Sequence, residues 1–208
     1  MVEAFDMLGF LTLANAPRRT VAWRHGSAVG YLEFLTRVSA WRAVLRRCDG
    51  HAFALYSEDS VELAGALFGA WQAGKIVYLP GDNLPGTCAG LRPIVDGFLG
   101  EFAPEWSPLA PLSHEPAVDA DDLRRLDGEF TGLVLFTSGT TGTPQTIAKK
   151  LAQMSREVAT LEIQFGQLLG SAAIVATVSH QHIYGLLFRV LWPLVAGRTF
   201  HARTYPYF

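Results

Sequence analysis

A loop rich in glycine and hydroxyl side chains is the part of this sequence best suited to chemistry. It runs from Thr137 to Thr146, between the apolar run TGLVLF and a helical pattern that starts near Lys149. Gly139 and Gly142 allow backbone conformations that other residues avoid, so a ligand can approach the main chain closely. Backbone N–H groups, hydroxyls and the positive charge of the lysines that follow favour a polyphosphate. The loop therefore predicts a phosphate-binding site between the end of a strand and the start of a helix.

The order of residues separates this loop from two common phosphate loops. Five residues after Gly139, Pro144 stands where a Walker A loop has glycine, and neither Gly-Lys-Ser/Thr nor G-x-G-x-x-G occurs. The run closely resembles the phosphate loop of the adenylate-forming superfamily, which includes acyl- and aryl-CoA synthetases, luciferases and the adenylation domains of peptide synthetases. The residues that this resemblance implicates in nucleotide binding are Thr137, Ser138, Gly139, Thr140, Thr141, Gly142, Thr143, Pro144, Gln145 and Lys149.

Three further segments resemble the same superfamily. Residues 31–45 are similar to its early helix, and residues 53–80 to its first strand-helix-strand unit. Residues 179–200 are similar to the segment whose histidine opens the acyl pocket. In this comparison His182 is the pocket residue and the candidate catalytic residue, with His180 as a close competitor. The resemblance implies a reaction of a carboxylic acid with Mg-ATP that gives an acyl-adenylate, an AMP ester, and pyrophosphate. Transfer to coenzyme A or to the thiol of an acyl carrier protein normally follows.

Two departures from the superfamily pattern limit what the resemblance implies. Pro144-Gln145-Thr146 stands where the superfamily usually has Pro-Lys-Gly, so Lys149 or Lys150 would have to supply the missing charge. The 208 residues also hold no match to the later adenine-binding strand, the ribose-binding Asp or the late catalytic Lys. We therefore expect the N-terminal portion of an ATP-dependent carboxylate-activating ligase that is inactive by itself. The alternative is a non-catalytic binding or interaction module that keeps the loop as an element of the fold.

The hydrophobic pattern predicts an α/β fold made of two parallel-sheet subdomains with flanking helices. The first subdomain is expected over residues 1–100 and the second over 129–208, incomplete at its C-terminal end. A proline-rich acidic connection over 101–128 separates them. The predicted helices cover residues 31–47, 58–75, 91–99, 149–169 and 184–195. The predicted strands cover residues 51–57, 75–80, 131–136, 172–178 and 198–202.

The composition excludes several other classes of protein. Half of the residues are hydrophobic, 17% are charged and the net charge is -2, so no basic surface for nucleic acid is expected. Cys48 and Cys88 fit neither a disulfide framework nor a metal site and are interpreted as reduced thiols in the cytoplasm. Arg189 and Pro193 interrupt the longest apolar tract, which is too short to span a membrane. A truncated fold would expose an apolar face, so self-association is also expected.

Overall fold

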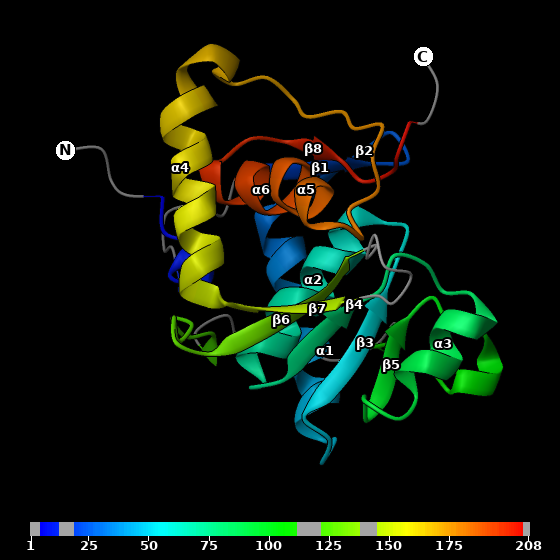
Figure 1. The fold of residues 1–208 in the computed structure, drawn as a ribbon. Coiled ribbons are helices and arrows are strands. Elements are labelled where there is room, and N and C mark those ends of the chain that lie inside the picture. The colour runs from blue at the N-terminus through cyan, green and yellow to red at the C-terminus, as the bar shows by residue number, and fades with distance from the viewer. Residues whose placement is uncertain (1–4, 13–18, 112–121, 138–144, 206–208) are drawn as a thin grey trace.

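The computed structural model describes residues 5–12, 19–111, 122–137 and 145–205, which form two sheets and their covering helices (Figure 1). The strands are β1 (Thr20–Arg24), β2 (Ser27–Gly30), β3 (Ala52–Tyr56), β4 (Ile76–Leu79), β5 (Gly97–Gly100), β6 (Thr131–Thr137), β7 (Gln145–Lys150) and β8 (Phe200–His201). The α-helices are α1 (Tyr31–Arg46), α2 (Ser60–Gln72), α3 (Pro85–Leu91), α4 (Leu151–Leu169), α5 (Ile183–Gly185) and α6 (Trp192–Ala196). A π-helical turn, Leu186–Leu191, joins α5 to α6. Short 3-10 helices cover Phe10–Thr12 and Pro104–Trp106.

The larger sheet has the strand order β5-β3-β4-β6-β7. The first four strands are parallel, and β7 is antiparallel to β6. Because β4 pairs with β6, strands from both sides of the 101–128 connection lie in one sheet. The smaller sheet has the order β2-β1-β8, so the ends of the described chain meet there. The α/β class with parallel strands is thus confirmed.

Helices α1 and α2 pack closely because small residues of α2 face α1. A Cβ atom added at Gly69 would lie 2.5 Å from the Cβ of Trp41 and 2.8 Å from the carbonyl oxygen of Val38. The α2 helix begins with a standard cap, since the Asp59 carboxylate accepts hydrogen bonds from two backbone N–H groups of its first turn, both at 2.9 Å. This arrangement fixes the end of β3 relative to α2.

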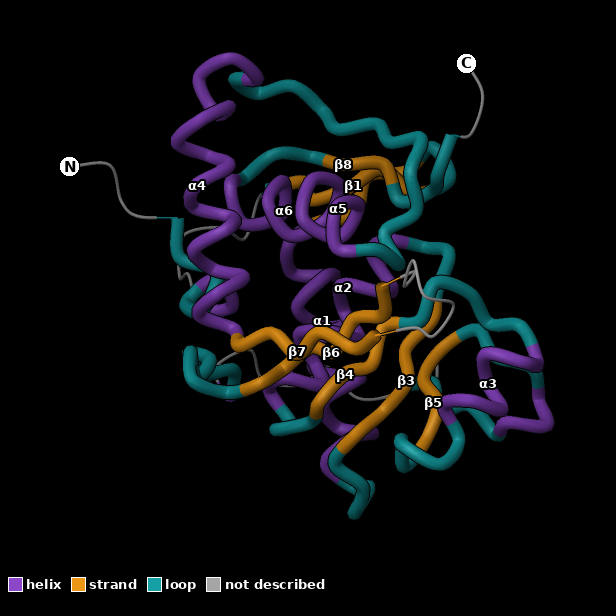
Figure 2. Tube along the Cα trace, in the orientation of Figure 1, coloured by secondary structure: helices purple, strands orange, loops and turns teal. Residues whose placement is uncertain are grey.

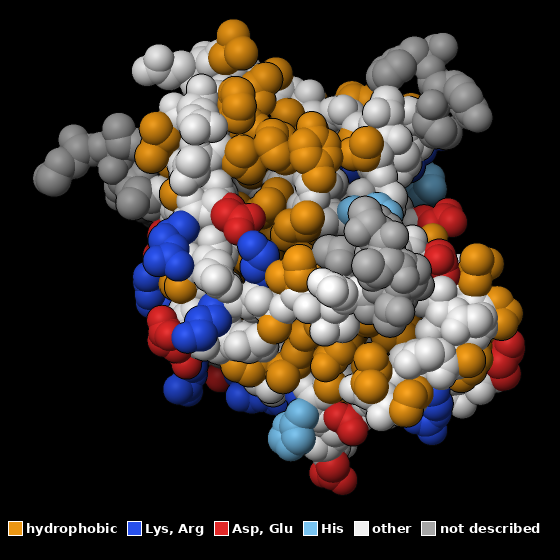
Figure 3. Space-filling model, viewed as in Figure 1, with side chains coloured by type: hydrophobic (Ala, Val, Ile, Leu, Met, Phe, Trp, Pro, Cys, Tyr) orange, Lys and Arg blue, Asp and Glu red, His pale blue; other side chains and the backbone are white. Residues whose placement is uncertain are grey.

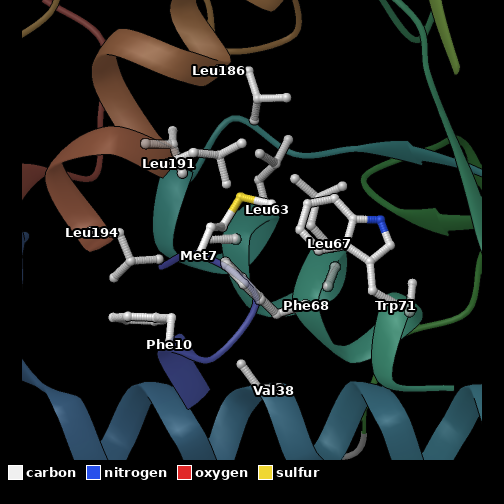
Figure 4. Packing of buried hydrophobic residues seen from close by; sticks show 14 of the residues in the cluster. Met7, Phe10, Val38, Leu63, Leu67, Phe68, Trp71, Leu186, Leu191 and Leu194 are labelled. Carbon is white, nitrogen blue, oxygen red and sulfur yellow. The ribbon is translucent and has the colours of Figure 1, made fainter. Parts of the chain in front are cut away.

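Two apolar clusters cover opposite faces of the larger sheet. The main core joins α1, α2, the inner face of the sheet and α6, with Phe10, Phe68 and Trp71 near its centre (Figure 4). The Trp71 indole N–H donates to the carbonyl of Gly132 at 2.9 Å, which ties α2 to β6. The second cluster contains Ala54, Cys88 and Phe98 and is contributed partly by α3. Therefore α2 and α3 lie on opposite faces of the sheet.

Several predicted elements are wrong or incomplete. Residues 91–99 do not form a helix, because α3 starts at Pro85 and ends at Leu91, and β5 follows from Gly97. Residues 172–178 are not a buried strand, since they have one isolated bridge, Ile174 to Phe200, and are largely exposed. An apolar run is buried only if a second layer covers it, and among these residues only Ile174 packs partly against the main core. Strands β1, β2 and β7 were not predicted.

Most other predicted elements are confirmed to within a few residues. The helices over 31–47, 58–75 and 149–169 correspond to α1, α2 and α4, and the 184–195 segment is helical with a π turn inside it. Both cysteines are free. Among the described residues, no helix has the length and apolar character needed to cross a membrane.

Candidate functional site

The connections after β3 and β4 leave the larger sheet on opposite faces. The chain passes from β3 into α2 on one face and from β4 into α3 on the other. In open parallel sheets, ligands bind outside the carboxyl ends of the strands at such a point. The carboxyl ends of β3, β4 and β6 lie at the same edge because the three strands are parallel. This edge is the candidate site.

The hydroxyl-rich loop begins at this edge. Thr137 is the last residue of β6, Gln145 is the first residue of β7, and the two are paired across the sheet. Ser138, Gly139, Thr140, Thr141, Gly142, Thr143 and Pro144 lie outside the described residues. The loop therefore connects two antiparallel strands, seen side by side in Figure 2, and does not lead directly into a helix as expected. The sheet fixes the start of the loop, on β6, next to β4, and its end, on β7, on the far side of β6.

His182 reaches the same edge from a distant part of the sequence. It precedes α5 as the N-cap residue, and its side chain is exposed. A Cβ atom added at Gly81, two residues after the end of β4, would lie 3.0 Å from the His182 Cε1 atom. The structure thus places His182 at the carboxyl end of β4, the strand that neighbours β6. Gly81 was not identified from the sequence, although its position just after a buried strand is a usable signal.

His180 has a different role from His182. Its side chain is 2% exposed, and its Nε2 lies 2.6 Å from the Ser57 carbonyl oxygen and its Nδ1 2.9 Å from the Ser60 hydroxyl. A carbonyl only accepts, so Nε2 carries the proton and Nδ1 accepts from Ser60. Burial lowers the pKa of His180 to about 4, although the bond to Ser57 partly opposes this. The ring is neutral and internal, which leaves His182 as the histidine available to a ligand.

A buried polar network holds residues 178–182 against the end of β3. Gln181 donates from Nε2 to the Ser57 carbonyl at 3.2 Å. Arg189, on the π-helical turn, donates to the carbonyls of Val178 at 3.1 Å and Ala202 at 2.9 Å. Burial lowers the pKa of Arg189 to about 10. None of these contacts was foreseen, and together they position the segment that presents His182.

The two lysines expected to serve the loop point elsewhere. Lys149 forms an ion pair with Glu157 at 2.9 Å, and Lys150 forms one with Glu129 at 2.7 Å. Both residues are in β7 and not in the first turn of the helix. Lys149 is four positions from Gln145, or about 13 Å at the usual strand rise. The structure therefore does not bring the Lys149 ammonium to the ends of the loop.

The neighbouring part of the edge is acidic. The Glu101 carboxylate accepts from the Ser57 hydroxyl at 2.7 Å and lies 3.3 Å from the Glu58 backbone nitrogen. Burial raises the pKa of Tyr56, and the charges of Glu58, Glu101 and Asp82 raise it further. No group of three or more His, Cys, Asp or Glu among the described residues is arranged to hold a metal ion. A polyphosphate here would depend on loop N–H groups and on the cation that it brings.

The mixed sheet with four parallel strands, covered by helices on both faces, defines the class of the chain as an open-sheet α/β fold. Comparison with solved structures gives the particular fold, which is that of the adenylate-forming enzymes, as the sequence resemblance predicts. Sequence comparison adds nothing to this, since no family profile matches the chain and no curated protein sequence matches it.

Three of the similar structures are an adenylation enzyme of peptide synthesis and two enzymes of the synthetase type. The nonribosomal peptide synthetase FmoA3, in an AMPPNP-bound form, has a TM-score of 0.70 at 17% identity, over 97% of this chain and 23% of its own. ATP-bound MatB from Rhodopseudomonas palustris has a TM-score of 0.68 at 17% identity, over 99% of this chain and 46% of its own. The o-succinylbenzoate CoA synthetase MenE from Bacillus subtilis has a TM-score of 0.70 at 16% identity, over 97% of this chain and 44% of its own. The chain thus spans less than half the length of these proteins.

Proposed function

We propose that this chain provides the phosphate-binding part of an ATP-dependent ligase that activates a carboxylic acid. The observation that carries the proposal is the meeting of two segments at one sheet edge. The loop from Thr137 to Gln145 starts and ends there, and His182 packs against Gly81 at the end of the adjacent strand. Two of the similar structures, FmoA3 with AMPPNP and MatB with ATP, contain a bound nucleotide, which supports a nucleotide as the ligand.

In this proposal the loop binds the β- and γ-phosphates of Mg-ATP through its backbone N–H groups and hydroxyls. A carboxylate oxygen of the substrate attacks the α-phosphorus in line, the bond to the bridging oxygen breaks, and pyrophosphate leaves. The products are an acyl-adenylate and pyrophosphate, and positioning and electrostatics contribute most of the catalysis. His182 shapes the acyl side of the site. A thiol, from coenzyme A or a carrier protein, then accepts the acyl group and AMP leaves.

We further propose that the 208 residues alone bind pyrophosphate or Mg-ATP weakly and do not catalyse the reaction. We also propose that the protein acts in the cytoplasm. No described residue has been matched to adenine or ribose recognition, and Gln145 lacks the charge of the usual lysine. Carboxylate-dependent exchange of labelled pyrophosphate into ATP measures catalysis directly. Robust exchange by the isolated chain would contradict the proposed inactivity.

Binding is tested by isothermal titration of the chain with magnesium pyrophosphate and with Mg-ATP. The variant Thr140→Ala/Thr141→Ala removes two loop hydroxyls, and we expect it to weaken binding at least tenfold, since a hydrogen bond to a charged group contributes about 1.5 to 3 kcal/mol and about 1.4 kcal/mol corresponds to a factor of ten. Thr160→Ala is the matched control, because Thr160 lies on α4 and bonds only to its own helix. Equal weakening in both variants, or none in the loop variant, would count against the site.

The second candidate is a non-catalytic interaction module, and an exposed apolar patch favours it. The patch consists of Phe165 and Leu168, three positions apart on α4, and Tyr184, whose ring stacks on Phe188 beside Phe165; the three side chains are 38% to 83% exposed. Figure 3 shows hydrophobic side chains gathered over this part of the surface. No detectable binding of either phosphate ligand at millimolar concentration would support the module. Self-association through the patch is compatible with both candidates.

A further inference from the structure

A pocket of 540 Å³ lies beside the smaller sheet and is not used by the proposed ligase function. Its volume falls within the range of small-molecule sites. It sits where β1 and β8, which run parallel, both end. The lining residues are Trp23, His25, Gly26, His201, Arg203 and Tyr205.

The sheet and two short connections hold these side chains together. Trp23 and His201 are partners in the register of β1 and β8, so they lie side by side on one face of the sheet. His25 and Gly26 form the turn between β1 and β2, with φ values of 50° and 82°. Two consecutive positive φ values are typical of the tight turns that match strand twist. The Tyr205 hydroxyl lies 2.9 Å from His201 Nδ1, and its backbone N–H donates to a neighbouring carbonyl, which fixes the far wall.

The charge of the pocket has one sign. Among the described residues that line the pocket, Arg203 is the single arginine or lysine, and none is an aspartate or a glutamate. Its guanidinium carbon lies 4.5 Å from the centre of the Tyr205 ring, so the side chain stacks on a fixed aromatic surface. Arg203 forms no ion pair with any other described residue. Its N–H groups are therefore available for a carboxylate or phosphate in the forked geometry that arginine favours.

The remaining walls are aromatic. The Trp23 indole is 41% exposed although it is a large apolar surface, and the imidazole of His25 is exposed at the turn. Flat rings of this kind stack on flat ligands. An arginine beside aromatic walls, with no Asp or Glu among the described lining residues, is the pattern expected for a ligand that carries an aromatic ring and a negative group.

We propose that this pocket binds an anionic aromatic small molecule, with its carboxylate or phosphate on Arg203 and its ring against Trp23. The site lies on the smaller sheet, whereas the loop and His182 lie at the carboxyl edge of the larger sheet. The ligand is therefore separate from the nucleotide of the proposed ligase. An aromatic carboxylate and a nucleoside monophosphate share the required chemistry.

The test is titration calorimetry of the full chain with two probes, 1-naphthoate and AMP. The neutral analogue 1-naphthalenemethanol and the non-aromatic cyclohexanecarboxylate test the two halves of the recognition. We expect at least one of the two probes to bind, and both analogues to bind about tenfold more weakly or not at all. Preference for 1-naphthoate or for AMP identifies the carboxylate or the phosphate as the natural group.

Variants locate the binding. Arg203→Gln removes the charge from an exposed side chain and should raise the Kd about tenfold or more. Arg92→Gln, which removes an exposed arginine far from the pocket, just after α3, should leave the Kd unchanged. Near-ultraviolet circular dichroism verifies that each variant keeps the wild-type fold. The proposal is overturned if neither probe binds at millimolar concentration, if the neutral analogue binds equally well, or if Arg203→Gln binds as the wild type does.

Discussion

The buried neutral His180 makes the stability of the fold depend on pH in a calculable way. Burial lowers its pKa from the ordinary 6.5 to about 4. Because the unfolded chain binds the proton more readily than the folded chain, stability falls as the pH drops from 6.5 toward 4 and then levels off. With these two pKa values, linkage gives a loss of about 2 kcal/mol between pH 7 and pH 5 from this one residue.

Urea denaturation at both pH values, followed by fluorescence, measures this loss in the wild type and in His180→Gln. The glutamine side chain is neutral throughout, so we expect the variant to lose about 2 kcal/mol less than the wild type over the same interval. The variant is also less stable at pH 7, because the Ser57 and Ser60 contacts are disturbed, but that difference does not enter the comparison of intervals. All carboxylates contribute equally to both proteins.

A matched variant, His51→Gln, removes an exposed histidine just before β3 and should keep the wild-type pH dependence. If His180→Gln loses as much free energy between pH 7 and pH 5 as the wild type, the assignment of a buried neutral ring is wrong. If only His51→Gln loses the pH dependence of stability, the dependence arises from His51 and not from His180. Either result would also remove the argument that separates His180 from His182.

Three further predictions concern the Arg198–Glu162 ion pair, the contact between α1 and α2, and the exposed apolar patch. Arg198→Met should lower the free energy of unfolding by about 3 kcal/mol in urea melts, since it leaves the largely enclosed Glu162 carboxylate without its ion-pair partner and with the Trp192 N–H alone; a neutral effect would show that the pair is dispensable. Gly69→Ala should lower the free energy of unfolding by about 2 kcal/mol, because the clash with Trp41 outweighs the better helix propensity of alanine. An increase in stability would contradict the close contact between α1 and α2. Leu168→Ser, at a side chain that is 83% exposed, should lower the average mass in light scattering while thermal stability stays nearly unchanged, and an unchanged mass would exclude this residue from self-association.

The strand-helix-strand unit could be predicted because its signals are local. Asp59 precedes an apolar helical stretch, and Gly74 follows it, so α2 and its flanking strands are readable from order and spacing. Strand β7 could not be predicted, because QTIAKK is polar and forms a strand only when β6 provides a partner. The same reasoning explains the error at residues 172–178, where apolar character does not reveal whether a second layer is present.

Of the candidate site, only the loop after β6 could be predicted from the sequence, and the arrangement of the histidine segment could not. The end of β6 and its glycine-rich loop stand out in sequence, whereas the roles of two histidines only two residues apart depend on what each contacts. His180 turns inward to Ser57 and His182 stays exposed beside Gly81, a distinction that no local pattern contains. Likewise, the ion pairs of Lys149 and Lys150 with distant carboxylates could not be read from their position after the loop.

The pairing of β1 with β8 also determines the order in which the chain completes its fold. Trp23 and His201 are partners in register although almost the whole chain separates them. During synthesis, β3, β4 and β5 can assemble on α1 and α2 while β1 has only β2 as a neighbour. Contacts between such distant segments form late, because closing a long loop costs more entropy than closing a short one. We therefore expect the smaller sheet to be the last part to form.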